Sequence, residues 1–305
     1  MPTGTGRFPR KPGQSVETMD IEVPARGMRF GALSWGAEDL DRPLALLIHG
    51  YPDTAHTWRY LGPRLAGEGY RVVAPFTRGY GPSSLAPDDS YRVSDQGEDV
   101  LALRDALGGD ERSVLVGHDW GAVALWWVTS TEPAAFSEFV AMSVPPPGAI
   151  AGPVRKVRGM PTAFRQLRMS WYFLFNQLPG SERSLNWIIP KLWRDWSPGY
   201  DASWDLPRVF AALDSRARRR AALRYYRNTL TIGIGELSRI EPEVPVLYLH
   251  GTTDGCAQVK LGRDYAGELP EGSRFTAVPG VGHFLHLEDP EVVNELILGW
   301  LGRPG

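Results

Sequence analysis

One short stretch, VLVGHDWGAVALWW from Val114 to Trp127, constrains the fold of this chain more than any other. Its first residues are apolar, as in a buried strand, and its last residues form an apolar, helix-like segment. Between them, Gly117 and Gly121 bracket Asp119. A strand that turns into a helix through two such glycines is the pattern of a nucleophile elbow, whose middle residue is usually serine. The stretch therefore predicts a strand–turn–helix unit that presents a carboxylate where a hydroxyl is usual.

Strand-like and helix-like runs alternate on both sides of this unit. Strands that are apolar throughout and alternate with helices indicate an α/β fold, a parallel sheet covered by helices on both faces. Such sheets bind ligands outside the carboxyl ends of their strands, where His49 and Asp119 lie. The expected elements are a hairpin at 20–35, strands at 44–48, 71–74, 114–116, 139–142, 244–250 and 274–278, and helices at 54–66, 94–107, 120–130 and 290–301.

The alternation stops at Pro145-Pro146-Pro147-Gly148 and resumes at Val244. Between these points the chain is rich in Arg and Trp and looks helical, with Pro and Gly interruptions. We therefore expect a core domain of residues 1–144 and 241–305, and a helical cap domain of residues 145–240. An insertion between strands whose ends carry the chemistry is well placed to act as a lid. Its basic run, Arg216 to Arg220, is interpreted as a solvated helix face.

Composition narrows the possible partners. The chain has 305 residues, is 43% hydrophobic and carries a formal net charge of −2, which favours neither nucleic acid nor an anionic membrane as a partner. The first twenty residues lack the apolar core of a signal peptide, and no apolar run is long enough to span a bilayer. The single cysteine, Cys256, excludes an intrachain disulfide and is interpreted as an inert small residue. We expect a cytoplasmic protein. The sequence does not predict its oligomeric state.

An aspartate at the elbow selects a particular class of electrophile. Asp119 is ionised at neutral pH, and the start of the following helix should favour its charge further. A carboxylate gains little by attacking an ester carbonyl, because the product would be a more reactive anhydride. It can attack a saturated carbon with a strained or good leaving group and form an alkyl ester of the enzyme. Asp119 therefore predicts an epoxide or a carbon–halogen bond as the substrate group.

Such an ester must then be hydrolysed, which requires a base for water and a partner that orients the base. Asp254 lies in a glycine-containing loop after a predicted strand, and His283 lies in a Gly-rich loop after the last one. His286 is the rival base, but it lacks the glycine context of His283. The histidines show no metal-binding spacing, so neither a metal nor another cofactor is expected.

Together these residues resemble the epoxide hydrolase family of α/β-hydrolases. The matching motifs are His49-Gly50-Tyr51-Pro52, Arg78-Gly79-Tyr80-Gly81-Pro82-Ser83, Gly117-His118-Asp119-Trp120-Gly121, and the Asp254 and His283 loops. The resemblance implies an α/β-hydrolase fold with a helical cap, with Asp119 as nucleophile, His283 as base and Asp254 as its orienter. It also implies an oxyanion hole from the backbone N–H groups of Tyr51 and Trp120, which matches the general rule for this fold.

The family also uses cap tyrosines to hydrogen-bond the epoxide oxygen. Two stretches, Ser170 to Phe175 and Leu223 to Asn228, resemble the tyrosine motifs and nominate Tyr172 and Tyr226, with Tyr225 as the alternative to Tyr226. Haloalkane dehalogenases share the elbow, although many place Asn where this chain has Tyr51. The expected function is hydrolysis of a small apolar epoxide to a vicinal diol. Haloalkane dehalogenation and a non-catalytic, ligand-binding hydrolase fold are the alternatives.

Overall fold

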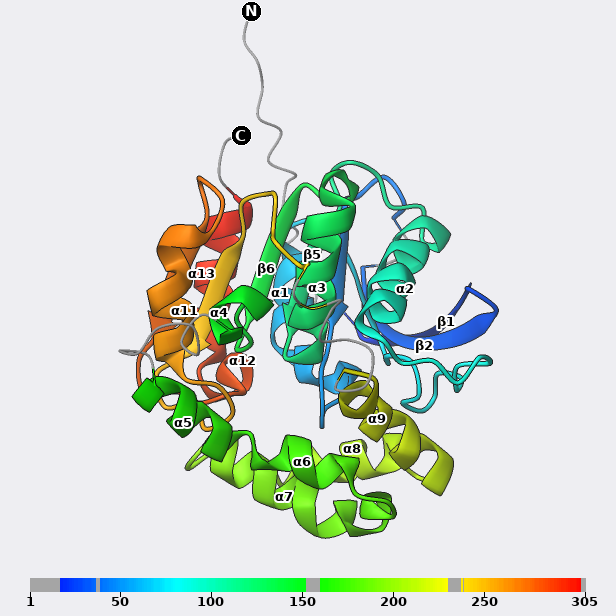
Figure 1. The fold of residues 1–305 in the computed structure, drawn as a ribbon. Helices are drawn as coiled ribbons and strands as arrows, with labels where there is room; N and C mark the ends of the chain where they lie inside the picture. The colour runs from blue at the N-terminus through cyan, green and yellow to red at the C-terminus, as the bar shows by residue number, and fades with distance from the viewer. Residues whose placement is uncertain (1–16, 37–38, 152–159, 230–236, 238, 303–305) are drawn as a thin grey trace, which may run out of the picture.

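The computed structural model describes residues 17–36, 39–151, 160–229, 237 and 239–302 (Figure 1). Its described strands form one eight-stranded sheet in the order β1-β2-β4-β3-β5-β6-β7-β8. β1 and β2 pair antiparallel with each other, β2 pairs antiparallel with β4, and the remaining pairs are parallel. The strands are β1 (Met19–Ala25), β2 (Met28–Trp35), β3 (Leu44–Ile48), β4 (Arg71–Pro75), β5 (Val114–His118), β6 (Glu138–Met142), β7 (Leu247–Gly251) and β8 (Arg274–Val278).

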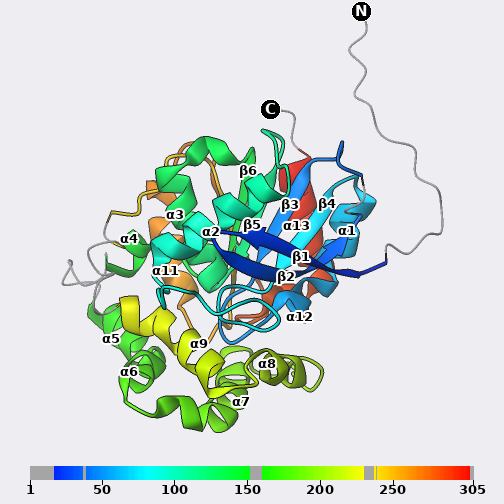
Figure 2. The ribbon, with the colours of Figure 1, turned by 90° about the vertical axis from the view of Figure 1, so that its right-hand side faces the viewer.

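Helices cover both faces of the sheet (Figures 1 and 2). In Figure 2, α2 (Val93–Ala106), α3 (Trp120–Thr131) and α11 (Val259–Tyr265) lie on one side, and α1 (Leu61–Gly67) and α13 (Pro290–Leu301) lie on the other. Every residue of β3, β4, β5 and β7 is buried, as expected for strands between two helical layers. The predicted α/β-hydrolase fold class is confirmed.

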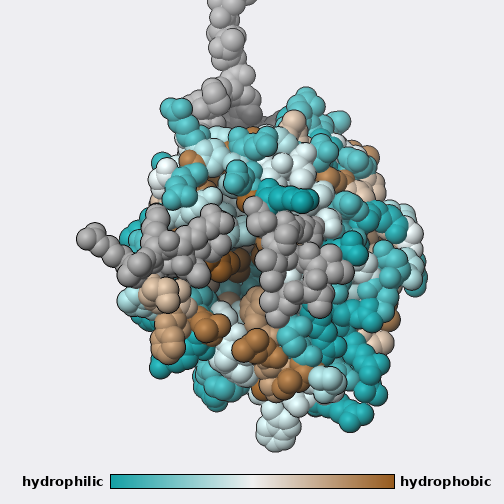
Figure 3. Space-filling model, in the orientation of Figure 1, coloured by the Kyte–Doolittle hydropathy of each residue, from teal (hydrophilic) through white to brown (hydrophobic). Residues whose placement is uncertain are grey.

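A group of helices lies across one end of the sheet, at the bottom of Figure 1. The described part of this segment contains only helices and loops: α4 (Pro147–Ala151), α5 (Met160–Met169), α6 (Trp171–Gln177), α7 (Leu185–Trp196), α8 (Leu206–Ala212) and α9 (Arg216–Asn228). We call it the cap; the exact boundaries of core and cap remain a prediction. In Figure 3, apolar surface is visible at this end of the molecule, and α5 exposes Met160, Phe164 and Leu167.

Two predicted elements differ from the structure at prolines. The helix expected at 54–66 is a 3₁₀ turn, η1 (Ala55–Arg59), followed by α1, because Pro63 cannot donate to the carbonyl of Arg59. The strand expected at 244–250 begins at Leu247, since Pro245 has no N–H for a sheet ladder. The hairpin, by contrast, is present, and its turn residues Arg26 (φ 47°) and Gly27 (φ 70°) both take the left-handed conformation typical of tight hairpins.

None of the described helices is long and apolar enough to cross a membrane.

Candidate active site

Asp119 lies at a sharp turn between β5 and α3. Its φ of 53° is unusual for a residue other than glycine, and the side chain is almost completely buried. The two flanking glycines are required by close backbone approach: a Cβ on Gly117 would overlap the carbonyl of Gly121, and one on Gly121 would overlap the carbonyl of Ile48. The glycine spacing of the sequence thus encodes an elbow that presses against the end of β3 and directs the carboxylate beyond the sheet.

The Asp119 carboxylate meets backbone amides at the end of β3. The N–H of Tyr51 donates to Asp119 Oδ1 at 2.7 Å. A Cβ on Gly50 would overlap the same oxygen and lie 2.6 Å from the amide nitrogen of Trp120. Gly50 therefore lets the Tyr51 and Trp120 amides and one carboxylate oxygen converge, as the predicted oxyanion hole requires. The Tyr51 and Trp120 side chains are buried beside it.

His283 lies between two carboxylates. Its Nδ1 donates to Asp254 Oδ2 at 3.0 Å, and its Nε2 lies 3.4 Å from Asp119 Oδ2. Nε2 is buried and makes no hydrogen bond with any described residue. Asp254 is held in turn by the backbone N–H groups of Cys256 and Ala257, which donate to its Oδ1 at 2.6 and 3.0 Å. The fold thus brings together three residues from three separate loops that the sequence nominated as nucleophile, base and orienter.

The surrounding charges shift the protonation of this group. Burial alone would lower the pKa of His283, but the charge of Asp254, the nearby Asp119 carboxylate and the hydrogen bond that Nδ1 donates to Asp254 raise it well above its usual value. Burial would raise the pKa of Asp254, but charged His283 and hydrogen bonds from His250 and His283 lower it strongly. The imidazole of the free protein is therefore stabilised as a cation between two anions.

The rival base His286 lies away from the Asp119 carboxylate. Its Nε2 contacts Thr57 Oγ1 at 2.5 Å, and its ring stacks on Trp58. Burial lowers the pKa of His286 well below its usual value. His286 therefore belongs to a neutral buried cluster behind the elbow, where it packs against His118.

The two cap tyrosines predicted from the sequence pack against each other, and Tyr226 also packs against Trp120, the residue after Asp119. Tyr172 on α6 and Tyr226 on α9 are buried, and their ring centroids lie 5.7 Å apart in an edge-to-face contact. Tyr226 also packs edge-to-face on Tyr51 and Trp120, with centroids at 5.1 Å in both pairs. Burial raises the pKa of both tyrosines well above the usual value, so each hydroxyl keeps its proton and can act as a donor.

Tyr225 occupies a different environment from Tyr226. Its hydroxyl donates to the backbone oxygen of Arg78 at 2.8 Å, and its ring lies against Tyr80 and Tyr91. The Tyr225 hydroxyl therefore already has a hydrogen-bond partner in the core. The geometry therefore favours Tyr226 as the second donor toward Asp119.

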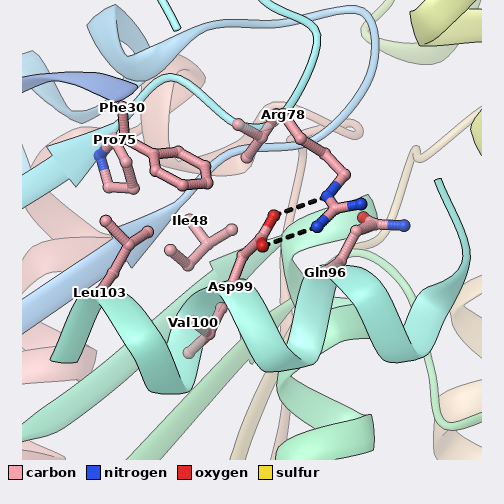
Figure 4. Close-up of a pocket in the computed structure, with 9 residues that line it drawn as sticks. Phe30, Ile48, Pro75, Arg78, Gln96, Asp99, Val100 and Leu103 are labelled. Carbon is pink, nitrogen blue, oxygen red and sulfur yellow. Dashed lines mark hydrogen bonds and ion pairs between the residues drawn. The ribbon is translucent and has the colours of Figure 1, made fainter. Parts of the chain in front are cut away.

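The motif around Arg78 joins the cap to the core and does not reach the carboxylate. Arg78 forms two hydrogen bonds of 2.6 Å with Asp99, beside a small cavity of about 20 Å³ between the sheet and α2 (Figure 4). The cavity is lined by Phe30, Ile48, Pro75, Thr77, Arg78, Gln96, Asp99, Val100 and Leu103, and Asp119 is absent from this lining. Its volume is that of about one water molecule. An internal ion pair therefore accounts for Arg78 in the matched sequence motif, while Tyr80 of the same motif packs edge-to-face on His49.

Two contributors to the site were missed by the sequence reasoning. Trp196, at the end of α7, packs its ring against both His283 and Tyr172, with centroids at 4.9 Å in each case. Cys256, interpreted from sequence as inert, places its Sγ 3.3 Å from the hydroxyl of Tyr172. The spacing of Cys256, two residues after Asp254, was the available signal for its position. No comparable signal for Trp196 is present in the sequence.

Two groups of described side chains have ligand atoms close enough to hold a metal ion. One consists of Asp119, Cys256 and His283, and the other of Asp53, His118 and His286. In each group the candidate atoms lie within 4.8 Å of one another and all residues are buried.

Comparison with known proteins agrees with this geometry. The sequence matches the alpha/beta hydrolase fold family over residues 43–290. It is 28% identical over 286 residues to the AB hydrolase superfamily protein YfhM of Bacillus subtilis (strain 168), covering 92% of this chain and 96% of that protein. It is 30% identical over 317 residues to Epoxide hydrolase A of Mycobacterium tuberculosis (strain ATCC 25618 / H37Rv), again covering 92% and 96%. The crystal structure of Epoxide Hydrolase A from Mycobacterium thermoresistibile aligns with a TM-score of 0.73 and 26% identity, covering 93% of this chain and 98% of that one.

Proposed function

Because this chain belongs to the epoxide hydrolase family of the α/β-hydrolase fold, we propose that it converts an epoxide to a vicinal diol through a covalent ester on Asp119. One observation carries the proposal. The elbow carboxylate has one oxygen on the Tyr51 amide, while the other faces His283 at 3.4 Å. A carboxylate placed in this way can attack carbon with one oxygen while the other is held by an amide.

The first step is attack on the epoxide carbon. Asp119 Oδ2 is the oxygen left free by the Tyr51 N–H and is therefore the attacking atom. Oδ1 then becomes the carbonyl oxygen of the ester, already beside the Tyr51 and Trp120 amides. When water later adds to this ester, the developing oxyanion forms where those donors already point. Removal of one such donor typically costs about 3 kcal/mol of transition-state stabilisation.

The opening ring needs an acid, since an alkoxide is a poor leaving group. Tyr172 and Tyr226 are protonated and buried, and Tyr226 packs on Tyr51 and Trp120 beside the carboxylate. Their hydroxyls can hydrogen-bond the epoxide oxygen from the side opposite Asp119, which leaves the carbon open to backside attack. The surrounding aromatic rings, including Tyr51, Trp120 and Trp196, suit a small apolar epoxide.

The second step depends on His283. While Asp119 is an anion, the imidazole is held as a cation and cannot accept a proton. Alkylation removes the charge of Asp119, so the pKa of His283 falls at the moment when a base is needed. Asp254 keeps Nδ1 protonated through its hydrogen bond, which directs the lone pair of Nε2 toward water near the ester. Water attack then releases the diol and restores the Asp119 carboxylate.

A single turnover in heavy-oxygen water tests the covalent route. Excess enzyme is mixed with styrene oxide, and the diol and the peptide containing Asp119 are analysed by mass spectrometry. The first-turnover diol should contain ordinary oxygen, because its new oxygen comes from the carboxylate, and the label should appear in Asp119. Enzyme incubated without substrate is the control and should stay unlabelled.

Label found directly in first-turnover diol would mean that water attacks the epoxide itself, and the nucleophile assignment would fail. A primary bromoalkane is assayed beside the epoxide. Faster turnover of the bromoalkane would make haloalkane dehalogenation the better description of the site.

A further inference from the structure

We propose that Asp119, Cys256 and His283 together form a binding site for a soft divalent cation, Zn²⁺ or Cd²⁺, whose binding blocks catalysis. The three residues supply an oxygen, a sulfur and a nitrogen ligand that lie within 4.8 Å of one another. The bound cation would occupy the nucleophile and the base at the same time. The site is therefore inhibitory and has no part in the epoxide reaction.

Cys256 is fixed so that its sulfur faces the reacting groups. Its backbone N–H donates to Asp254 Oδ1 at 2.6 Å, and its carbonyl accepts a hydrogen bond from Gln166 Nε2 at 2.9 Å. With both backbone groups held, the side chain extends toward Tyr172, and Sγ lies 3.3 Å from the tyrosine hydroxyl. Only 3% of the residue is exposed, so the thiol belongs to the enclosed site and not to the surface.

His283 supplies a second and independent observation, a buried ring nitrogen beside the Asp119 carboxylate. Its Nε2 is buried and makes no hydrogen bond with the described residues, although Asp119 Oδ2 is 3.4 Å away. Zinc binds sulfur, nitrogen and oxygen at about 2.0–2.3 Å, so tetrahedral ligands lie roughly 3.5 Å from one another. The separation of the nitrogen and oxygen already matches this value. Because all three ligand atoms lie within 4.8 Å of one another, the sulfur needs a shift of about 1.3 Å at most to reach the same ligand spacing.

The hydrogen bonds around the three proposed ligands also suit a metal ion. The Nδ1 of His283 donates to Asp254 Oδ2, which reproduces the carboxylate–histidine–metal arrangement that orients imidazole ligands. The hydroxyl of Tyr172 can donate to a metal-bound thiolate. Cys256 and His283 would release their protons on binding, and two anionic ligands would then neutralise the divalent cation. Three protein ligands leave the fourth position of a tetrahedral site for a water molecule.

Cadmium titration of the whole protein tests binding without reference to activity. Cd²⁺ bound to a thiolate gives an ultraviolet absorption band, and because the chain contains one cysteine, that band reports Cys256 alone. The parent should show one-site binding in calorimetry together with the band. Cys256→Ser should lose the band. Its affinity for Cd²⁺ should fall by more than about 10- to 100-fold, which is the usual loss when a residue that only hydrogen-bonds to a metal ligand is removed. Asp53→Asn, in the other candidate cluster, should bind Cd²⁺ as the parent does.

Inhibition of epoxide hydrolysis by Zn²⁺ is measured next, with each variant compared with its own metal-free rate. This inhibition measurement rests on the proposed function. The parent should be inhibited competitively and recover with chelator, whereas Cys256→Ser should resist. Unchanged Cd²⁺ affinity in Cys256→Ser, or a loss in Asp53→Asn, would overturn the assigned site. A thiolate band without inhibition of an active enzyme would overturn the blocking role. If no epoxide is hydrolysed at all, the proposed function fails, while the titration still decides the metal site.

Discussion

In the proposed mechanism, His283 is held as a cation in the free protein, where its pKa is raised, and must act as a neutral base one step later. The change follows from its neighbours, since Asp119 loses its charge on alkylation while Asp254 keeps its own. A raised pKa in the free protein also has a consequence for stability. The ion pair stabilises the fold fully below the unfolded pKa of histidine, and this contribution is lost as the pH rises through the higher folded value.

The two chemical steps should therefore respond differently to acid. Ester hydrolysis requires neutral His283, so its rate should fall about tenfold per pH unit below the pKa of the alkylated enzyme. Alkylation requires only the Asp119 anion and protonated tyrosines, so it should stay nearly constant over the same range. Presteady-state fluorescence of Trp120, which packs beside Tyr226, resolves the two phases. A parallel decline of both phases with one apparent pKa would contradict this assignment.

The hydroxyls of Tyr172 and Tyr226 should determine the alkylation rate. Tyr172→Phe and Tyr226→Phe each remove a donor and should slow alkylation by about 100- to 10,000-fold, the usual range for general acid help. Tyr225→Phe is the matched control, because its hydroxyl binds the Arg78 carbonyl. It should alkylate at the parent rate and lose about 1 kcal/mol of stability. A slow Tyr225→Phe combined with a normal Tyr226→Phe would reverse the assignment of the second donor.

At the scale of elements, the end of α7 packs on the loops that carry Asp254 and His283, the proposed orienter and base. The N–H groups of Gly255 and His283 both donate to the carbonyl of Trp196, at 3.1 and 3.0 Å. A Cβ on Gly255 would overlap the carbonyl of Asp195, and one on Gly282 would lie 2.5 Å from that of Trp196. Each glycine therefore admits the backbone of the cap helix directly against the catalytic loops.

Gly255→Ala should separate α7 from these loops. The added methyl group meets backbone, which cannot move as a flexible side chain would, so we expect a loss of about 1–3 kcal/mol. Activity should fall as well, because Trp196 contacts both His283 and Tyr172. Gly299→Ala in α13 is the control, since its Cβ would meet no atom within 4 Å, and it should stabilise the helix slightly. Urea unfolding and kcat/KM are measured for both; parent-like values for Gly255→Ala would show that the interface adapts.

The sequence was most informative where a local pattern decides the structure. The closing helix at 290–301 and the glycines around Asp119 were recognised because periodicity and turn chemistry are encoded in neighbouring residues. The positions of Trp196 and Cys256 depend on how α7 and α6 pack on distant loops, and spacing along the chain carries no information about such contacts. The same limit left the choice between Tyr225 and Tyr226 open in the sequence, whereas the hydrogen bond from the Tyr225 hydroxyl to the Arg78 carbonyl favours Tyr226.

At the scale of the whole molecule, the cap is attached to the core at a second place, the loop at 78–83. Tyr225 donates to the Arg78 carbonyl, Arg218 Nη1 donates to the Ser83 carbonyl at 2.7 Å, and the Gly81 N–H donates to the Ala212 carbonyl at 2.9 Å. The loop is itself held by Arg78, whose buried guanidinium pairs with Asp99. Arg26, in the hairpin turn, donates to the same carboxylate at 2.8 Å. One carboxylate on α2 thus joins the hairpin, the loop and, through the loop, the cap.

Asp99→Asn should therefore weaken the whole molecule more than a surface change would. The substitution keeps the size of the side chain but removes the closer of the two carboxylates beside the buried Arg78, since Asp95 lies 3.8 Å away, and breaking a buried ion pair typically costs about 3–5 kcal/mol. Glu98→Gln is the matched control, because Glu98 pairs with Arg26 at the surface and should change stability by less than about 1 kcal/mol. Urea unfolding of the two variants gives the free energies of unfolding.

The loop at 78–83 forms hydrogen bonds with α8 and α9 of the cap. Asp99→Asn should therefore also raise KM for the epoxide under conditions where the fold is still intact. If Asp99→Asn unfolds at the urea concentration of the parent, the Arg78–Asp99 pair does not hold the loop, and the link from α2 to the cap fails.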